Sequence, residues 1–319
     1  MQDFLPAYST TLTPPASLSP SPASAALQIA FGPPDSPALK CGLPVLAGPA
    51  VEHLFATATP AGRAGAIALF RQGPWLLGGA SVPASGGLEP AVRQLYTDLL
   101  RATAGLHLAR IWNYVPAINQ LGPDGLENYR LFSRGRSLAF EAHFGPGFKP
   151  LLPSASAVGA ESDHFTVVFA ATSARALHVE NPLQVSAYDY PAEYGPRAPS
   201  FARATVVGGA QPSAVFISGT AAIRGHATVA PGELAPQLEC TLGNLRQVSQ
   251  ACGLGPDLGR DGPLPRHFKV YVRRAEDHAD VARFLRQKLL TAADTVTYLQ
   301  ADICRAALVV EIEVTLLKG

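Results

Sequence analysis

The chain ends in two strand-like runs joined by a short turn, which read Tyr298-Leu-Gln-Ala-Asp-Ile-Cys304-Arg-Ala-Ala-Leu-Val-Val-Glu311-Ile-Glu313-Val314. In the second run the carboxyl groups of Glu311 and Glu313 alternate with apolar residues, and the apolar composition predicts a buried strand. A buried carboxylate costs several kcal/mol unless it is paired, protonated or used in function. This pattern therefore bears on function as well as on fold.

Composition predicts a globular protein and argues against two classes of partner. The chain has 319 residues, of which 47% are hydrophobic, and this suffices for a sizeable core and for two domains of ordinary size. The formal net charge is +1 and no long run of Lys or Arg occurs, so we expect no binding to nucleic acid or to an anionic membrane.

Cysteine, histidine and hydropathy patterns bear on localisation and cofactors. No stretch approaches the ~18 apolar residues of a membrane span, and the first thirty residues lack the basic start of a signal peptide. The four cysteines form no C-x-x-C pair, which predicts reduced thiols and a cytoplasmic location. No histidine shows zinc-binding spacing, so we expect no structural metal.

The hydrophobic pattern predicts the same order of elements twice. In the first half we expect a hairpin at 65–79, a helix at 89–104, a strand at 106–115, a helix at 125–144 and strands at 164–171 and 176–188. In the second half we expect a hairpin at 202–223, a helix at 234–252, a strand at 267–274, a helix at 277–290 and strands at 295–304 and 307–317. The fold class is therefore α+β, with two copies of one module, each a mixed sheet backed by two helices.

Residues 191–200 are rich in proline and contain a glycine, which suits a linker between the two modules. We therefore predict an N-terminal domain over residues 1–195 and a C-terminal catalytic domain over residues 196–319. Residues 6–25 are dense in Pro, Ser and Thr, which neither helices nor central strands accept readily. We interpret them as a leader with little function.

The second half resembles the RidA (YjgF) family, whose small module has this α+β architecture. The similar stretches are Ile217-Ser218-Gly219-Thr220-Ala221, Gln237-Leu-Glu239-Cys-Thr241-Leu-Gly-Asn244 and Val310-Glu311-Ile-Glu313. The imine deaminases of that family hold the substrate carboxylate with an arginine two residues before a cysteine. This chain has Asp302 at that position, and an aspartate repels a carboxylate, so imine deamination is disfavoured.

Over the whole chain the better resemblance is to the chorismatases, which carry a RidA-like C-terminal domain behind an N-terminal domain of related shape. The stretches that carry it are Arg110-Ile-Trp-Asn113-Tyr114-Val-Pro116-Ala-Ile-Asn119, Glu127-Asn-Tyr129-Arg-Leu-Phe-Ser-Arg134-Gly-Arg136-Ser-Leu-Ala-Phe140, Asn181-Pro-Leu-Gln-Val-Ser-Ala-Tyr188-Asp-Tyr190-Pro and Pro199-Ser-Phe-Ala-Arg203-Ala. Chorismatases cleave the enolpyruvyl ether of chorismate and release pyruvate with a ring product, without a metal or organic cofactor.

The resemblance implies a set of substrate-binding residues. Chorismate bears two carboxylates, so its pocket needs fork-shaped cationic donors and hydroxyl groups. By resemblance the donors are Arg136 and Arg203, and the hydroxyls belong to Tyr129 and Tyr190. Aromatic packing and solvated surface charge are the structural alternatives for these four side chains.

Glu311 resembles the catalytic glutamate of the family. Protonation of the terminal methylene of the enol ether needs an acid that keeps its proton near neutral pH, and burial raises the pKa of a carboxyl group. Glu313 shares the face of the strand by alternation and is the rival for this role. Exposed amides at Gly219 and Thr220 would suit a substrate carboxylate, although the turn can also be a plain strand end.

Cys304 bears on the product. Chorismatases that form hydroxybenzoate carry a cysteine seven residues before the glutamate, whereas those that hydrate the ether tend to carry a small inert residue there. The resemblance therefore implies a lyase that makes 3-hydroxybenzoate, with 4-hydroxybenzoate as a further product left open, and that feeds aryl pigment or quinone synthesis. Without the resemblance, an inert strand cysteine would be the ordinary interpretation.

Two other functions stay open. A chorismate vinyl-ether hydrolase would give a dihydroxycyclohexadiene carboxylate, and Cys304 argues against it. A non-catalytic RidA-like small-molecule binding protein would keep the arginines but would need neither Cys304 nor Glu311. RidA modules usually trimerise, and two copies in one chain leave monomer, dimer and trimer open.

Overall fold

The structure is a computed structural model, and it describes residues 28–31, 41–53, 55, 57–209 and 211–317. The leader expected at 6–25 lies outside these residues. Within the described part of the chain, no helix combines the length and the apolar character that a membrane crossing requires.

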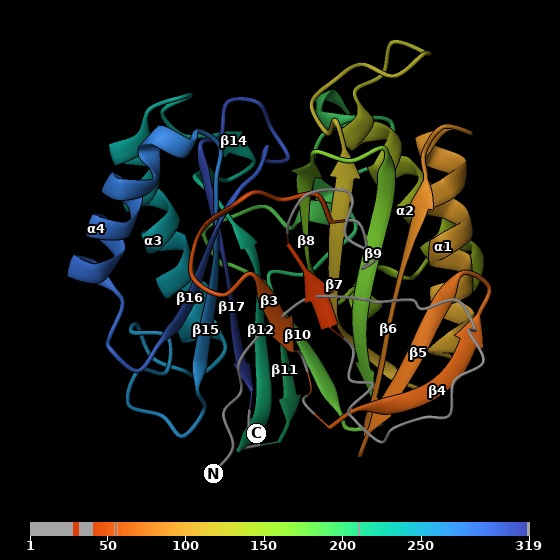
Figure 1. Cartoon of the computed structure of the whole chain (residues 1–319), viewed down its shortest axis with the longest axis horizontal. Coiled ribbons are helices and arrows are strands. Elements are labelled where there is room, and N and C mark those ends of the chain that lie inside the picture. Colours follow the sequence, from red (N-terminus) through yellow and green to blue (C-terminus); the bar gives the residue numbers. More distant parts are fainter. Residues whose placement is uncertain (1–27, 32–40, 54, 56, 210, 318–319) are drawn as a thin grey trace.

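Two sheets pack face to face, and two helices cover the outer side of each (Figure 1). The helices α1 (Leu88–Ala102) and α2 (Asn128–Phe144) cover the first sheet, and α3 (Leu234–Ala251) and α4 (His278–Lys288) cover the second. Apolar residues at helical spacing, such as Leu95 and Leu99 in α1, face the first sheet and are buried. The layers therefore run helix, sheet, sheet, helix.

The first sheet has six strands in the order β4-β5-β6-β9-β7-β8. Their bounds are β4 (Thr59–Ala64), β5 (Ile67–Gln72), β6 (Trp75–Pro83), β7 (His107–Pro116), β8 (Ser154–Ala160) and β9 (His164–Thr172). All neighbours pair antiparallel except β7 and β8, which are parallel because α2 provides the crossover between them.

The second sheet has seven strands in the order β10-β11-β12-β17-β15-β16-β2. Their bounds are β10 (Ala176–Val179), β11 (Ala204–Gly208), β12 (Pro212–Thr220), β17 (Val310–Leu317), β15 (Arg266–Val272), β16 (Thr295–Gln300) and β2 (Val45–Ala47). Two short pairs lie outside the sheets, β1 (Gln28–Ala30) with β3 (Val51–His53) and β13 (Ile223–Arg224) with β14 (Ala227–Thr228).

The predicted repeat is confirmed. The order β5-β6-β9-β7-β8 in the first sheet corresponds to β11-β12-β17-β15-β16 in the second, and in both modules the single parallel pair is joined by the second helix. The predicted α+β class, with two mixed sheets each backed by two helices, therefore holds. The strands β2 and β10 precede residue 196 yet pair in the second sheet, and the boundary at 195 stays a prediction.

The strand predicted at 164–171 is confirmed as β9 (His164–Thr172), but the strand predicted at 176–188 was wrong, because it ends at Val179 and joins the other sheet. The sequence analysis also did not predict β8 (Ser154–Ala160), which precedes β9 in the first sheet. Strand β8 consists largely of Ser, Ala and Gly and is buried on both faces, so it lacks the bulky alternation that marks a strand.

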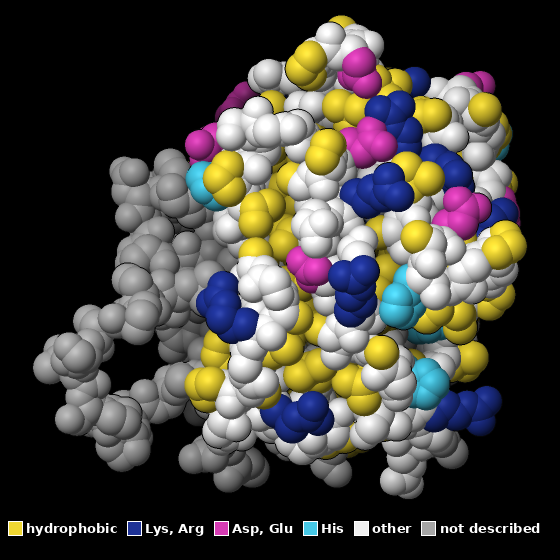
Figure 2. Space-filling model, turned by 90° about the vertical axis from the view of Figure 1, so that its right-hand side faces the viewer, with side chains coloured by type: hydrophobic (Ala, Val, Ile, Leu, Met, Phe, Trp, Pro, Cys, Tyr) yellow, Lys and Arg dark blue, Asp and Glu magenta, His cyan; other side chains and the backbone are white. Residues whose placement is uncertain are grey.

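Between the two sheets lies a core that both modules share. It contains large aromatic side chains of both sheets, among them Trp112 of β7, Phe216 of β12 and Tyr271 of β15. On the outer face over α1 and the β4–β5 hairpin, basic and acidic side chains are interspersed with apolar ones, so this face carries no continuous field of one charge (Figure 2).

Candidate active site

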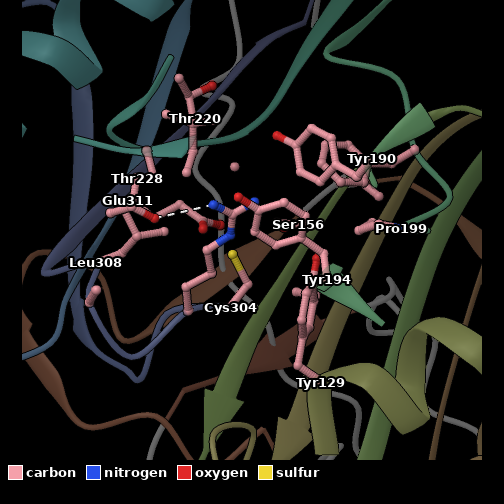
Figure 3. A pocket seen from close by; sticks show the side chains of 18 of the residues that line it. Tyr129, Ser156, Tyr190, Tyr194, Pro199, Thr220, Thr228, Cys304, Leu308 and Glu311 are labelled. Carbon is pink, nitrogen blue, oxygen red and sulfur yellow. Dashed lines mark hydrogen bonds between the residues drawn. The ribbon is translucent and has the colours of Figure 1, made fainter. Parts of the chain in front are cut away.

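A cavity of about 490 Å³ lies where the two modules meet. From the first module it is lined by α2 and β8, and from the second by the end of β12, the turn after β16 and the start of β17. Residues 184–203, which connect the modules, supply a further wall. All eight residues expected at the site line this cavity, namely Tyr129, Arg136, Tyr190, Arg203, Gly219, Thr220, Cys304 and Glu311. Figure 3 labels five of them, Tyr129, Tyr190, Thr220, Cys304 and Glu311.

Glu311 extends into the cavity from β17, the strand between β12 and β15. Its side chain is buried, and its Oε1 atom has no hydrogen-bond partner among the described residues. Burial raises the pKa of this carboxyl to about 8, and the charge on Glu313 adds to the rise while Arg110 and Arg203 oppose it. The Glu311 carboxyl therefore keeps its proton at neutral pH.

Gly219 gives the Glu311 carboxyl its space. The pairing of β12 with β17 shifts register between Ile217 and Thr220, and Gly219 lies in this irregularity. A Cβ atom on residue 219 would overlap the Glu311 carboxyl, so a larger residue would push the acid out of its position. The hydroxyl of Thr220 donates to the carbonyl of Ser218 at 2.8 Å and stays free to accept.

Glu313 lies two residues further along β17, outside the cavity lining, and is fully partnered. Its carboxylate accepts hydrogen bonds from Arg110 Nη2 (2.6 Å), Ser156 Oγ (2.6 Å), Trp112 Nε1 (2.7 Å) and Tyr271 OH (3.2 Å), and it forms an ion pair with Lys269 Nζ (2.8 Å). Burial acts to raise its pKa, but Lys269 and Arg110 outweigh this and hold the pKa at about 2. This carboxyl is therefore ionised and has no proton to transfer.

Arg136 lines the cavity and has buried donors without partners in the described part of the chain. It lies on the same face of α2 as Tyr129, two turns away, and is buried with its guanidinium 4.6 Å from the centre of the Phe132 ring. Its Nε and Nη2 atoms are buried and have no hydrogen-bond partner among the described residues. Buried donors are rarely left without an acceptor, and a carboxylate ligand would satisfy this pair.

Arg203 precedes β11 and reaches the cavity from the second module. Its Nη2 donates to the hydroxyl of Tyr190 at 2.8 Å and to the carbonyl of Val185 at 3.3 Å. Its Nε has no hydrogen-bond acceptor among the described residues, and the nearest carboxylate oxygen, Glu180 Oε2, is 3.9 Å away. Arg203 thus has one donor available for a ligand, and its hydrogen-bond partner Tyr190 also lines the cavity.

Cys304 lies in the turn between β16 and β17, with its sulfur directed into the cavity (Figure 3). Burial raises the pKa of this thiol to about 12, and the charge of Glu311 acts in the same direction. The site therefore holds a neutral thiol close to a protonated carboxyl. A neutral thiol can exchange a proton but does not persist as a nucleophilic thiolate.

Arg305 was missed in the sequence analysis although it lines the cavity. Its guanidinium lies 4.1 Å from the ring centre of Tyr194 and 5.3 Å from that of Tyr190. It donates to the carbonyl of His226 at 2.8 Å and to the hydroxyl of Thr228 at 3.2 Å. Its position next to Cys304 in the sequence could have indicated a residue of the site. Its two tyrosine partners lie more than a hundred residues upstream, so no local sequence pattern links them to Arg305.

The described residues contain no group of three or more His, Cys, Asp or Glu side chains arranged to hold a metal ion. What the cavity offers instead is one neutral acid, one neutral thiol, four arginines and several hydroxyls. This arrangement can bind a carboxylate-bearing molecule and protonate it.

Comparison with known proteins gives the family. Residues 53–171 match the family described as "Chorismatase FkbO/Hyg5-like, N-terminal". A protein named Chorismatase from Streptomyces hygroscopicus is 40% identical over 255 residues, which cover 77% of this chain and 73% of that protein. A protein named 3-hydroxybenzoate synthase from the same organism is 37% identical over 265 residues, which cover 77% and 75%.

A crystal structure of a chorismatase matches with a TM-score of 0.73 at 35% sequence identity, and the match covers 83% of this chain and 82% of that one. The match covers most of both chains at 35% identity, so it shows a shared family and not only a shared fold. This chain belongs to the chorismatase family, and the predicted resemblance is confirmed.

Proposed function

We propose that this protein cleaves chorismate to pyruvate and 3-hydroxybenzoate. The observation that carries the proposal is the protonated Glu311 carboxyl, which faces a cavity that also holds buried arginine donors without acceptors. The relatives named Chorismatase and 3-hydroxybenzoate synthase support the choice of substrate and product.

The arginines give the cavity its selectivity for a dianion. Arg136 has two unpartnered donors and Arg203 has one, and the two side chains come from different elements, α2 and the segment before β11. Two carboxylates on one substrate can therefore be held at once, with hydroxyl groups of Tyr129 and Tyr190 nearby. Charge-assisted hydrogen bonds of this kind are about twice as strong as neutral ones, so these contacts favour a substrate with two carboxylates over a neutral one.

In the first chemical step, Glu311 gives its proton to the terminal methylene carbon of the enol ether. The ether carbon becomes oxocarbenium-like, which weakens the bond from the ether oxygen to the ring. The ring 4-hydroxyl then attacks the ring carbon that carries the ether. The ring–oxygen bond breaks, pyruvate leaves with the ether oxygen as its ketone oxygen, and the hydroxyl proton returns to the Glu311 carboxylate.

The epoxide that results opens because the ring becomes aromatic. One ring hydrogen is lost as a proton and one proton is gained by the oxygen, so a phenol forms without net uptake of water. Cys304 would assist this proton transfer as a neutral thiol, consistent with its raised pKa. Hydroxybenzoate and pyruvate together have the composition of chorismate, and the enzyme regains its starting protonation state.

The alternative is a hydrolase in which water captures the oxocarbenium-like centre and a dihydroxycyclohexadiene carboxylate is released with pyruvate. The observation in its favour is that the relatives at 40% identity are named Chorismatase without a product. Formation of 4-hydroxybenzoate beside the 3-isomer is a further open outcome. A non-catalytic binding protein is the third alternative, and pyruvate release from chorismate excludes it.

The test is product analysis by chromatography after incubation with chorismate, for the unaltered protein and for Cys304→Ala. We expect hydroxybenzoate and pyruvate from the unaltered protein. In Cys304→Ala we expect pyruvate release to persist while the ring product shifts toward the dihydrodiol acid. Cys252→Ala, which changes a half-buried cysteine at the end of α3 away from the cavity, is the matched control and should leave the products unchanged.

Each contrary result has a distinct meaning. Absence of pyruvate would contradict the enzymatic proposal, and dihydrodiol acid from the unaltered protein would select the hydrolase. An unaltered hydroxybenzoate yield in Cys304→Ala would show that Cys304 is only packed into the wall of the cavity.

A further inference from the structure

Arg273 contacts the turn that carries Cys304 from outside the cavity. It follows the last residue of β15, and its Nε donates to the carbonyl of Leu308 at 2.6 Å. Its Nη2 donates to the carbonyls of Ile303 at 3.1 Å and Arg305 at 3.0 Å. One guanidinium therefore binds three backbone carbonyls on both sides of Cys304.

The same guanidinium also ties this turn to the first module. Its Nη1 and Nη2 both lie 3.1 Å from Oδ1 of Asn119, and Nη1 forms an ion pair with Asp302. Nδ2 of Asn119 donates to Oε1 of Glu127 at 3.2 Å, and Glu127 lines the cavity. Arg273 thus fixes the turn of residues 301–309 with respect to a wall of the cavity that belongs to the other module.

Cys304 and Glu311 are held in place by different means. Glu311 lies within β17, where backbone ladders to β12 and β15 fix its position. Cys304 lies in a turn without such ladders, where Arg273 binds the carbonyls of Ile303, Arg305 and Leu308. Of the carbonyls in this turn, Gln237 binds only that of Ala307, which lies further along the chain from Cys304 than Ile303 and Arg305 do. Loss of the guanidinium would therefore displace the thiol before it displaced the acid.

We propose that Arg273 is a positioning residue that sets the place of the Cys304 thiol and thereby the ring product of the reaction. This inference rests on the proposed function, because it concerns the step after proton transfer from Glu311. When the thiol is displaced, water competes with the ring rearrangement and captures the oxocarbenium-like centre. This capture consumes one water molecule and yields the dihydrodiol acid and pyruvate. A lysine cannot take over, because a single ammonium with three donors cannot reproduce the fork that binds three carbonyls and Asn119.

The test compares Arg273→Lys with Arg274→Lys. Arg274 is the next residue, partly exposed and paired with Asp277, and it donates to none of the carbonyls of residues 301–309. In Arg273→Lys we expect the ratio of hydroxybenzoate to dihydrodiol acid to fall by about tenfold or more, since a misplacement of ~1 Å can cost about a hundredfold in rate. Total pyruvate release should change much less, and Arg274→Lys should leave both quantities unchanged.

A second readout does not depend on the proposed function. Hydrogen exchange of the amides in residues 301–309 should be faster in Arg273→Lys than in the unaltered protein, and unchanged in Arg274→Lys. If Arg273→Lys does not fold, Asn119→Ala, which removes the acceptor from the first module, must lower the product ratio; an unaltered ratio there would overturn the proposal.

The failures of the two proposals are distinguishable. If the unaltered protein makes no hydroxybenzoate, the proposed function fails. If it makes hydroxybenzoate but Arg273→Lys gives the same product ratio and the same exchange rates, the proposed function stands and the role of Arg273 is overturned.

Discussion

Glu311 and Glu313 are two residues apart on β17, both buried, and their surroundings make them chemically opposite. Glu313 accepts hydrogen bonds from both modules and has a pKa of about 2, whereas Glu311 has an unpartnered oxygen and a pKa of about 8. Nothing in the strand pattern distinguishes them. The comparison shows that the role of a carboxyl group is decided by what the other module brings to it.

The two carboxyls also depend on each other. The negative charge of Glu313 raises the pKa of Glu311, so the ionised group helps the neighbouring acid to keep its proton. Lys269, which pairs with Glu313, also pairs with Glu52 of β3 at 3.0 Å. The buried charges that fix the two modules together thus also set the protonation state of the cavity.

The largest effect should come from Glu313→Gln, which would leave Arg110 and Lys269 with insufficient negative charge in the core. Breaking a buried ion pair from one side typically costs about 3–5 kcal/mol, and we expect a loss of this size in the free energy of unfolding by urea. Glu239→Gln is the control, because Glu239 is exposed on α3 and its ion pair with Lys288 is long, at 3.7 Å. Equal stabilities of the two variants would show that Glu313 is not the structural member of the pair.

A smaller effect should follow from Arg203→Lys. The ammonium keeps the charge but loses the fork that serves both Tyr190 and a substrate carboxylate, so affinity for chorismate should fall by roughly 1–3 kcal/mol. The melting temperature should change little. Arg246→Lys, on the surface of α3, is the matched control. A lowered melting temperature with an unchanged KM would make Arg203 a structural contact between the modules.

A further effect is a pH dependence of stability. The Glu311 carboxyl ionises near 4.5 when unfolded and near 8 when folded, so the unaltered protein loses folding stability as pH rises through this window. Glu311→Gln lacks this titration, and its stability relative to the unaltered protein should therefore increase with pH between these values and stay constant below them. The urea midpoints of both proteins over a pH series measure this difference. If the midpoints of the two proteins change in parallel with pH, Glu311 is not held protonated in the folded protein.

Sequence patterns were sufficient for most of the elements and, with the family resemblance, for eight of the residues that line the cavity. They failed for β8, whose small residues carry no strand pattern, and where the determinant lies far away in the chain. Glu313 and Arg110 are 203 residues apart, so the pair that distinguishes Glu313 from Glu311 has no local signature. For the same reason Arg305 was overlooked, because its tyrosine partners come from the connection between the modules.

The most direct test of the central claim, that Glu311 is the acid of a chorismate-cleaving enzyme, is pyruvate release from chorismate by the unaltered protein and by Glu311→Gln. The amide keeps the shape of the side chain but has no proton to transfer, so we expect a loss of at least about a hundredfold, with chorismate binding retained. Release by the unaltered protein should decline as pH rises through about 8, where the carboxyl ionises. Near-normal release by Glu311→Gln, or release that does not decline in that range, would contradict the account.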